Sequence, residues 1–394
     1  MHAGAPFREL CFSYLYLWDN LTVRHHSQSL LSADAIRWTF QFTTKSKPKR
    51  RSTDLLSVSA ASFRHALSVL SVSSSLRTLG LSWIRVEPAH QILILSIKTL
   101  RTLELVNSIF APTSVVMHRS SIKALLLEGS SPVPVTLLGS SLEGLRLKRW
   151  NNQPHELDIL ASTPLPRLTF LENSIMMKLP THDYFASFRN IRTLILSSLG
   201  PVSVPPTALP YLTNLSAPHD VGKALLPGRP VYTYHLRYIY YPVWWGSIDN
   251  PLMEVALCAQ HVKELHLWLC TPPWKLAAFL TLHFPNIVRL YMNLTHSDNL
   301  DNGDSPQFLC RTHRSLREFD IGFHVTKGQS LPREACRKAL KKLTEVCPAL
   351  EVVRFGELFP VDGGSIDERD VRLDWVMDMR RTAGGEWQER KWWI

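Results

Sequence analysis

The feature that most constrains this chain is a short apolar pattern, L-x-x-L-x-L with substitutions, that recurs along most of its length. The segment LRTLEL shows it best, because Leu103 and Leu105 alternate there with Glu104. Such alternation predicts a short strand with one buried face, and Leu100 suits the turn that precedes it. Copies of the pattern begin at Leu76, Leu100, Ile122, Leu142, Leu165, Ile191, Leu209, Val262, Ile287, Leu316 and Leu350.

The spacing of these copies predicts the architecture. The first six copies follow one another at steps of 20 to 26 residues, which fall within the ~20 to 29 residues of leucine-rich repeats. Segments between the copies have helical periodicity, most clearly REACRKALKKLTEVC from Arg333, which has an apolar and a basic side. We therefore expect an α/β fold, an irregular leucine-rich-repeat-like solenoid (horseshoe) with parallel strands on the concave face and helices on the convex face.

Changes of composition along the chain divide it into four parts. An N-terminal segment precedes a basic linker, the repeat array follows, and a polar, tryptophan-rich segment closes the chain as a cap on the last repeat. We place these parts at residues 1–44, 45–60, 61–361 and 362–394.

Two segments depart from the simple repeat. An aromatic-rich insertion covers about residues 216–250, where local alternation favours strands packed into the array. In the cap, the spacing of Val371, Trp375 and Met379 predicts a helix within residues 365–382.

Composition and motifs argue against several classes of protein. The net charge of +11 favours acidic partners. Six cysteines without a C-x-x-C pair are typical of a reducing compartment. The N-terminus lacks the features of a signal peptide, and no apolar run approaches the ~18 residues of a membrane span, so we expect no membrane partner.

The sequence contains no familiar catalytic motif. We find no G-x-S-x-G, H-E-x-x-H, Walker phosphate loop or G-x-G-x-x-G. Cys310 and His313 have the gap of a metal-ligand pair, but no second pair accompanies them. Glu318 and Asp320 are compatible with acid/base chemistry, although such a pair is more typical of an exposed strand face. We expect neither an enzyme, a metal site nor a cofactor.

The most basic run, KSKPKRR, begins at Lys45. It fits a nuclear-import signal, with a solvated linker as the alternative, so we expect a cytoplasmic or nuclear protein. The residues of this candidate signal are Lys47, Lys49, Arg50 and Arg51.

If the strands run as predicted, the residues that alternate with the buried leucines face a partner. This surface mixes Arg, Trp and Tyr, as interaction hot spots do. A shift of register by one residue would invert each set. The candidate contact residues are Arg146, Lys148, Glu264, His266, Trp268, Tyr291, Glu318, Asp320 and Arg354.

Three features together resemble the F-box-like protein family of mushroom-forming fungi. They are the irregular repeats, with Pro285 and Pro348 before two of them, the segment LTNLSAPHDVGKALLPGRPV from Leu212, and the segment FRELCFSYLYLWDNLTV from Phe7. The last segment is similar to the end of an F-box. There the resemblance implies a closing helix that includes Phe7 and Leu10, followed by an exit at Leu17 and Trp18.

The resemblance implies the substrate-recognition subunit of a Skp1–cullin ubiquitin ligase, with a substrate protein held on the array. The L-P-x-E-L-L signature of the first F-box helices has no counterpart, so we expect an incomplete F-box and doubtful docking on Skp1. The alternative is a stand-alone repeat binding module without a ligase role. A basic nucleic-acid-binding protein is a further alternative: the aromatic stretch from Tyr232 could offer stacking surfaces, although its alternation favours a role in packing.

Overall fold

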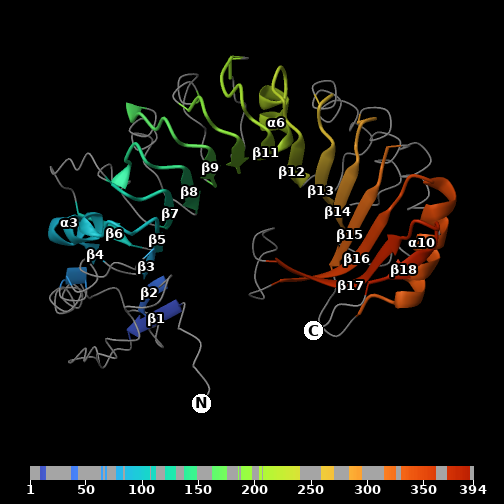
Figure 1. Cartoon of the computed structure of the whole chain (residues 1–394), viewed down its shortest axis with the longest axis horizontal. Coiled ribbons are helices and arrows are strands. Elements are labelled where there is room, and N and C mark those ends of the chain that lie inside the picture. The colour runs from blue at the N-terminus through green and yellow to red at the C-terminus, as the bar shows by residue number, and fades with distance from the viewer. Residues whose placement is uncertain are drawn as a thin grey trace. The chain divides into compact units, whose positions relative to one another are not determined.

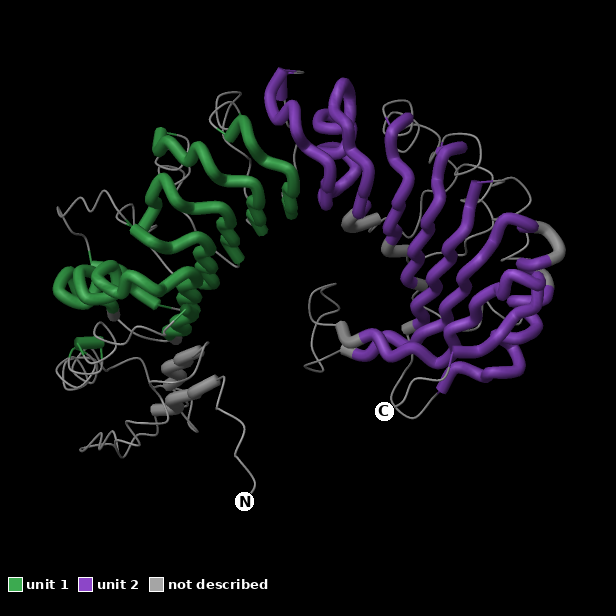
Figure 2. Tube along the Cα trace, in the orientation of Figure 1, with its two compact units in different colours: residues 1–198 green, residues 199–394 purple. Residues whose placement is uncertain are grey.

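The chain folds into two compact units, residues Met1–Ser198 (unit 1) and Leu199–Ile394 (unit 2) (Figure 2). Each unit of this computed structural model is α/β, with a mostly parallel sheet and few helices. The structure describes residues 9–14, 37–42, 64, 67–68, 77–82, 85–106, 108–111, 120–129, 137–148, 162–174, 185, 188–197, 204–205, 207–239, 259–269, 284–294, 315–324, 330–360 and 371–390.

In unit 1 the main sheet is parallel, and its strands lie side by side in chain order (Figure 1). Two short strands, β4 (Arg85–Val86) and β6 (Ile109–Phe110), form a separate parallel pair. Helix α3 (Pro88–Ser96) follows β4 in the sequence. The main strands are β1 (Glu9–Tyr14), β2 (Arg37–Phe42), β3 (Thr78–Ser82), β5 (Thr102–Val106), β7 (Ala124–Glu128), β8 (Gly144–Lys148), β9 (Phe170–Asn173) and β10 (Thr193–Leu196).

The leucine pattern produces these strands in the predicted way. In β5, Leu103 and Leu105 are fully buried, while Thr102 and Glu104 are only partly covered. The amide of Leu100 donates to the carbonyl of Ile97, which closes a turn before the strand. One side of β5 therefore packs into the core, and the other side faces away from it.

Unit 2 repeats this arrangement and ends differently. Strands β11 to β16 are parallel, and the chain then reverses so that β17 runs antiparallel to β16 and β18 antiparallel to β17. The elements are β11 (Asn214–Ala217), α6 (His219–Leu225), β12 (Thr233–Ile239), β13 (Glu264–Leu269), β14 (Arg289–Leu294), β15 (Glu318–His324), α10 (Arg333–Val346), β16 (Val352–Pro360), β17 (Val371–Arg381) and β18 (Trp387–Glu389).

Helix α10 confirms the helix predicted from Arg333. Cys336, Ala339 and Leu343 lie on its buried side, and Arg337 and Lys338 are exposed on the other side. Apolar burial along one stripe stabilises such a helix more than intrinsic propensity does. Among the described residues, no helix is both long and apolar enough to span a bilayer.

Two copies of the repeat differ from the sequence interpretation. In β9, Leu171 pairs with Leu145 and Asn173 with Leu147 of β8, so this copy begins at Leu168, three residues later than the pattern predicts. A further copy, which the pattern search missed, begins at Val231: Tyr234 and Leu236 take the leucine positions, and all three side chains are buried. Part of the aromatic-rich insertion is therefore a regular strand of the ladder, β12.

The helix predicted within residues 365–382 is wrong, because Val371–Arg381 form strand β17. The physical reason is the nine-residue strand β16, whose backbone groups need partners and pair with β17 from Val352 to Pro360. The closing helix predicted around Leu10 is also contradicted where it is described, since Glu9–Tyr14 form strand β1. Phe7, Leu17, Trp18 and the candidate import signal within residues 45–60 lie outside the described residues.

Candidate functional site

The candidate site is the side of the unit 2 sheet that faces away from the leucine core. The strands are in register, so side chains from neighbouring strands form two rows across this side, which we call the polar face. The first row is Asn214, Thr233, Glu264, Arg289, Glu318, Val352 and Arg380, and the second is Ser216, His235, His266, Tyr291, Asp320, Arg354 and Asp378.

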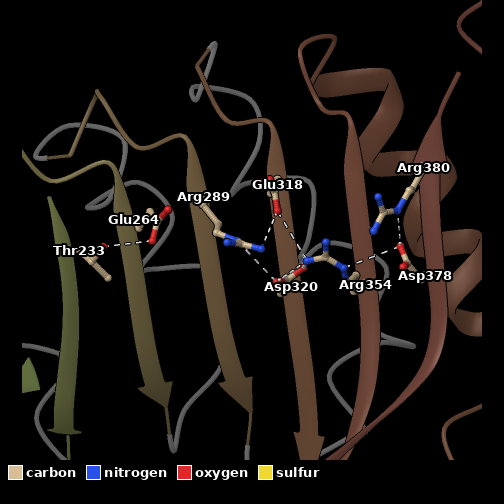
Figure 3. Close-up of polar contacts among 8 residues, drawn as sticks. All are labelled: Thr233, Glu264, Arg289, Glu318, Asp320, Arg354, Asp378 and Arg380. Atoms are coloured by element: carbon tan, nitrogen blue, oxygen red, sulfur yellow. Dashed lines mark hydrogen bonds and ion pairs between the residues drawn. The ribbon is translucent and has the colours of Figure 1, made fainter. Parts of the chain in front are cut away.

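A network of ion pairs crosses four strands of the polar face, β14 to β17 (Figure 3). Arg354 occupies its centre: its Nη1 lies 2.9 Å from both carboxylate oxygens of Asp320 and 3.6 Å from Glu318. Arg289 lies 2.8 Å from Glu318 and 3.9 Å from Asp320. Each of these carboxylates is thus shared between two guanidinium groups.

The ion pairs continue onto β17, the strand that runs antiparallel to β16. Asp378 of β17 lies 3.8 Å from Nε of Arg354 and 3.5 Å from Nε of Arg380. Asp378 is fully buried and Asp320 is 5% exposed. Removing one partner of such a pair leaves a buried charge uncompensated, which costs about 3–5 kcal/mol. The network therefore fixes the side chains of β14 to β17 in one arrangement.

Burial sets the electrostatics of Asp320. Loss of water raises the pKa of its carboxyl, while Arg354 and Arg289 act in the opposite direction. The hydrogen bonds from Arg354 engage both oxygens of this carboxylate. Because its oxygens are already occupied, Asp320 is suited to holding Arg354 rather than to abstracting a substrate proton.

Beside the ion pairs lies a short row of rings. His235 and His266 stack with their centroids 3.7 Å apart and their planes 15° apart, and Tyr291 lies 5.2 Å from His266. Burial, then His235 and then Arg289, lowers the pKa of His266 to about 3. Its imidazole is therefore neutral near pH 7, and the three rings form an aromatic part of the polar face.

One glycine lets side chains approach the sheet closely at the other end of the face. A Cβ on Gly356 would lie 2.6 Å from Cδ1 of Leu373 and 3.0 Å from the ring of Trp375. The Trp375 ring in turn lies 6.0 Å from the guanidinium carbon of Arg354, within reach of a cation–π contact. Gly356 thus allows β17 to place an aromatic ring beside the ion pairs.

Unit 1 carries the other two predicted contact residues. Arg146 is exposed, and Lys148 is about one quarter exposed. They lie 3.7 Å and 3.9 Å from the buried carboxylate of Glu172. The guanidinium of Arg146 also lies 5.0 Å from the ring centroid of Phe170. These residues form a separate cluster in unit 1.

The structure brings six of the nine predicted contact residues together on the polar face: Glu264, His266, Tyr291, Glu318, Asp320 and Arg354. Trp268 lies in β13, and its side chain is outside the described part of the chain. Asp320 differs from the expectation because it is buried rather than exposed.

Sequence reasoning missed four further members of the site. His235 belongs to the unrecognised repeat VYTYHL, in which a tyrosine stands at a leucine position. Asp378, Arg380 and Trp375 fall in the segment interpreted as a helix. An alternation test over residues 371–381 would have been the signal for the latter three.

Neither a metal centre nor a catalytic arrangement emerges from the described residues. They contain no group of three or more His, Cys, Asp or Glu side chains that could hold a metal ion. Cys310 and His313 lie outside them. Glu318 and Asp320, once compatible with acid/base work, both lie in ion pairs.

A scan of the chain against protein-family models gives no match, and a search of curated proteins gives none either.

Proposed function

We propose that the chain is a protein-binding repeat module without catalytic activity, and that the polar face of unit 2 holds the partner. The observation that carries this proposal is the row His235, His266 and Tyr291 beside the fixed Arg354 and Trp375. Tyr, Trp and Arg are the residues most enriched in binding hot spots. Side chains that are already fixed lose less entropy when a partner binds.

The repeat itself supports this function. Each strand contributes one or two outward side chains at fixed register, so variation at these positions changes specificity without changing the core. Within this proposal the units are leucine-rich-repeat-like arrays, with the polar face on the concave side and helices such as α10 on the convex side.

The resemblance to the F-box-like family supplies a cellular role for such a module. In this role the chain is the substrate-recognition subunit of a Skp1–cullin ubiquitin ligase, and the protein held on the array is the substrate. The alternative is a stand-alone binding module, and strand β1, where the resemblance implied a helix, favours it.

Quantitative capture of proteins from a lysate tests the binding surface. We compare the wild-type chain, His266→Ala/Tyr291→Ala on the polar face, and Arg337→Ala/Lys338→Ala on the exposed side of α10. Proteins that are retained by the wild type and the α10 variant, but lost with the polar-face variant, support the proposal. The same proteins retained by all three baits would contradict it, provided that the variants unfold at the wild-type temperature.

A separate measurement decides the ligase role. The full chain and purified Skp1 are mixed at micromolar concentration and run on a size-exclusion column. Co-elution supports the ligase role. Separate elution refutes it and leaves the binding module intact.

A further inference from the structure

The positive charge of the chain is concentrated in one unit. Residues 1–198 contain 22 Lys and Arg against 12 Asp and Glu, so 22 − 12 gives +10. Residues 199–394 contain 22 against 21, so 22 − 21 gives only +1. The excess charge thus belongs to unit 1, whereas the polar face lies in unit 2.

Exposure sharpens this difference. Nine basic residues described in unit 1 are exposed, whereas the acidic side chain of Glu143, which is 45% exposed, is paired with Lys123 at 2.7 Å. The described acidic side chains, Glu87, Glu104, Glu128, Glu143 and Glu172, are all partly or fully buried. The exposed basic side chains are Arg64, Arg77, Lys98, Arg101, Lys123, Arg146, Arg167, Arg189 and Arg192.

Seven of these nine side chains lie along one edge of the unit 1 sheet. Parallel strands in register begin at the same edge, and backbone hydrogen bonds link the residues just before them, from Arg101 to Arg77 and from Lys123 to Arg101. Neighbouring strands are ~4.8 Å apart, so these positions form a closely spaced line. We call this edge the strand-start ridge; its basic members are Arg77, Lys98, Arg101, Lys123, Arg167, Arg189 and Arg192.

The ridge contains side chains from two structural positions. Arg77, Arg101, Lys123 and Arg192 come directly before a strand, as does the acidic Glu143, which is paired with Lys123. Lys98, Arg167 and Arg189 lie in the turns that precede the strands, and the turns of neighbouring repeats are in contact, as the bond from Asn190 to the carbonyl of Pro166 shows (2.6 Å).

The same edge of unit 2 has a different character. Arg317 is paired there with Glu351, as Lys123 is with Glu143 in unit 1, but the side chain of Lys263 lies over the ring of Tyr232. Tyr211 and Tyr232 are exposed along it. The basic ridge is therefore specific to unit 1 and does not follow from the repeat itself.

We propose that the strand-start ridge of unit 1 binds an acidic, extended protein segment. This inference rests on the protein-binding function proposed above and adds a second surface to it. Carboxylates on one side of an extended segment recur every ~6.5 Å, which allows successive acidic side chains to reach neighbouring basic residues of the ridge. A nucleic acid is disfavoured because the described part of unit 1 exposes no aromatic ring on which a base could stack.

The test uses the full chain and two fluorescent probes, a decamer of glutamate and a decamer of uridine RNA. Anisotropy titrations compare the wild type with Lys98→Gln/Arg167→Gln/Arg189→Gln on the ridge. Arg337→Gln/Lys338→Gln/Lys341→Gln on α10 removes the same charge elsewhere and serves as the matched control. A milder variant, Lys98→Gln/Arg189→Gln, replaces the triple variant if the latter unfolds early.

We expect the wild type to bind the glutamate decamer more tightly than the RNA. The ridge variant should weaken this binding about tenfold or more, and the α10 variant less than about twofold. Equal weakening by both variants would reduce the effect to net charge and overturn the proposal, as would absence of binding to the glutamate decamer. Tighter, ridge-dependent binding of the RNA would replace it with a nucleic-acid surface.

The design separates this inference from the function of unit 2. His266→Ala/Tyr291→Ala should leave binding of the glutamate decamer unchanged, because both residues lie in the other unit. Loss of protein capture by that variant reports on the polar face alone, and loss of decamer binding by the ridge variant reports on the ridge alone.

Discussion

Replacement of Arg229 by methionine removes a guanidinium group that joins three backbone segments of unit 2. The side chain is 2% exposed. Two of its acceptors, Ala224 and Leu225, lie in the last turn of α6, where helix carbonyls lack intrahelical donors. The guanidinium nitrogens donate to the carbonyls of Pro205 (2.7 Å), Ala208 (2.8 Å), Leu225 (3.1 Å), Ala224 (3.2 Å) and Pro227 (3.2 Å).

The size of the effect follows from the acceptors. A buried carbonyl left without a donor costs ~1–3 kcal/mol, and the bonds to Ala208 and Leu225 are buried. Water can replace the donor at the three part-buried carbonyls. Burial also lowers the pKa of Arg229, so methionine relieves a desolvation cost that offsets part of the loss. We expect Arg229→Met to lower the free energy of unfolding by about 2–4 kcal/mol.

Urea unfolding followed by tryptophan fluorescence measures this change. The control is Arg337→Met on the exposed side of α10, which should stay within ~0.5 kcal/mol of the wild type. Arg229→Lys keeps the charge but lacks the planar guanidinium group that donates to several carbonyls, so it should lose most of the same stability. Equal midpoints for Arg229→Met and Arg337→Met would refute this account of Arg229.

Three further outcomes follow from burial and charge. Leu103→Ala should cost about 2–5 kcal/mol in urea unfolding because Leu103 is fully buried, whereas Glu104→Ala should cost under ~0.5 kcal/mol; equal midpoints would contradict the assignment of faces. Gly222→Ala brings a Cβ against the Tyr234 hydroxyl, so thermal unfolding should show a loss of about 1–3 kcal/mol, which Tyr234→Phe should partly restore. The folded-state pKa of His266 is about 3, below its unfolded value of 6.5, so the stability that the neutral imidazole gives the folded protein is lost as pH falls from 6.5 toward 3. Between about pH 7 and pH 4.5 the urea midpoint of His266→Gln should therefore fall less than that of the wild type. Parallel curves would argue against a neutral, buried imidazole.

Much of the fold could be predicted from the leucine spacing. Short strands that bury alternate residues leave a clear period of two, and the turn residue three positions earlier fixes where each strand begins. Strands β5, β7 and β8 show this burial pattern in the structure. Prediction was weaker where another residue type occupied a leucine position, as Tyr234 does in β12.

The C-terminal strands could not be predicted in the same way. Apolar residues spaced by four, such as Val371 and Trp375, fit a helix and also fit a strand with a bulge. The register of β17 shifts between Met377 and Trp375 opposite Phe355 and Gly356. This shift puts Trp375 and Asp378, three residues apart, opposite Gly356 and Arg354 on one side of the sheet. Alternation over residues 371–381 therefore indicates a strand but not which of its residues face the ion pairs.

The candidate site was predictable in position but not in its interactions. The alternation of buried and exposed residues placed Glu318 and Arg354 on one face, and in the structure their charged groups lie 3.6 Å apart. Asp378, a further partner of Arg354, comes from a strand that runs in the opposite direction. Contacts of this kind depend on topology and register, which the spacing of residues within one repeat does not contain.

Photo-crosslinking tests most directly the central claim that the polar face of unit 2 binds a protein partner. A photoreactive phenylalanine replaces Tyr291 on the polar face, or Lys338 on the exposed side of α10 as the matched position. After irradiation with a partner identified by the capture comparison, our account predicts a crosslinked product from position 291 and none from position 338. A product from position 338 alone would contradict it.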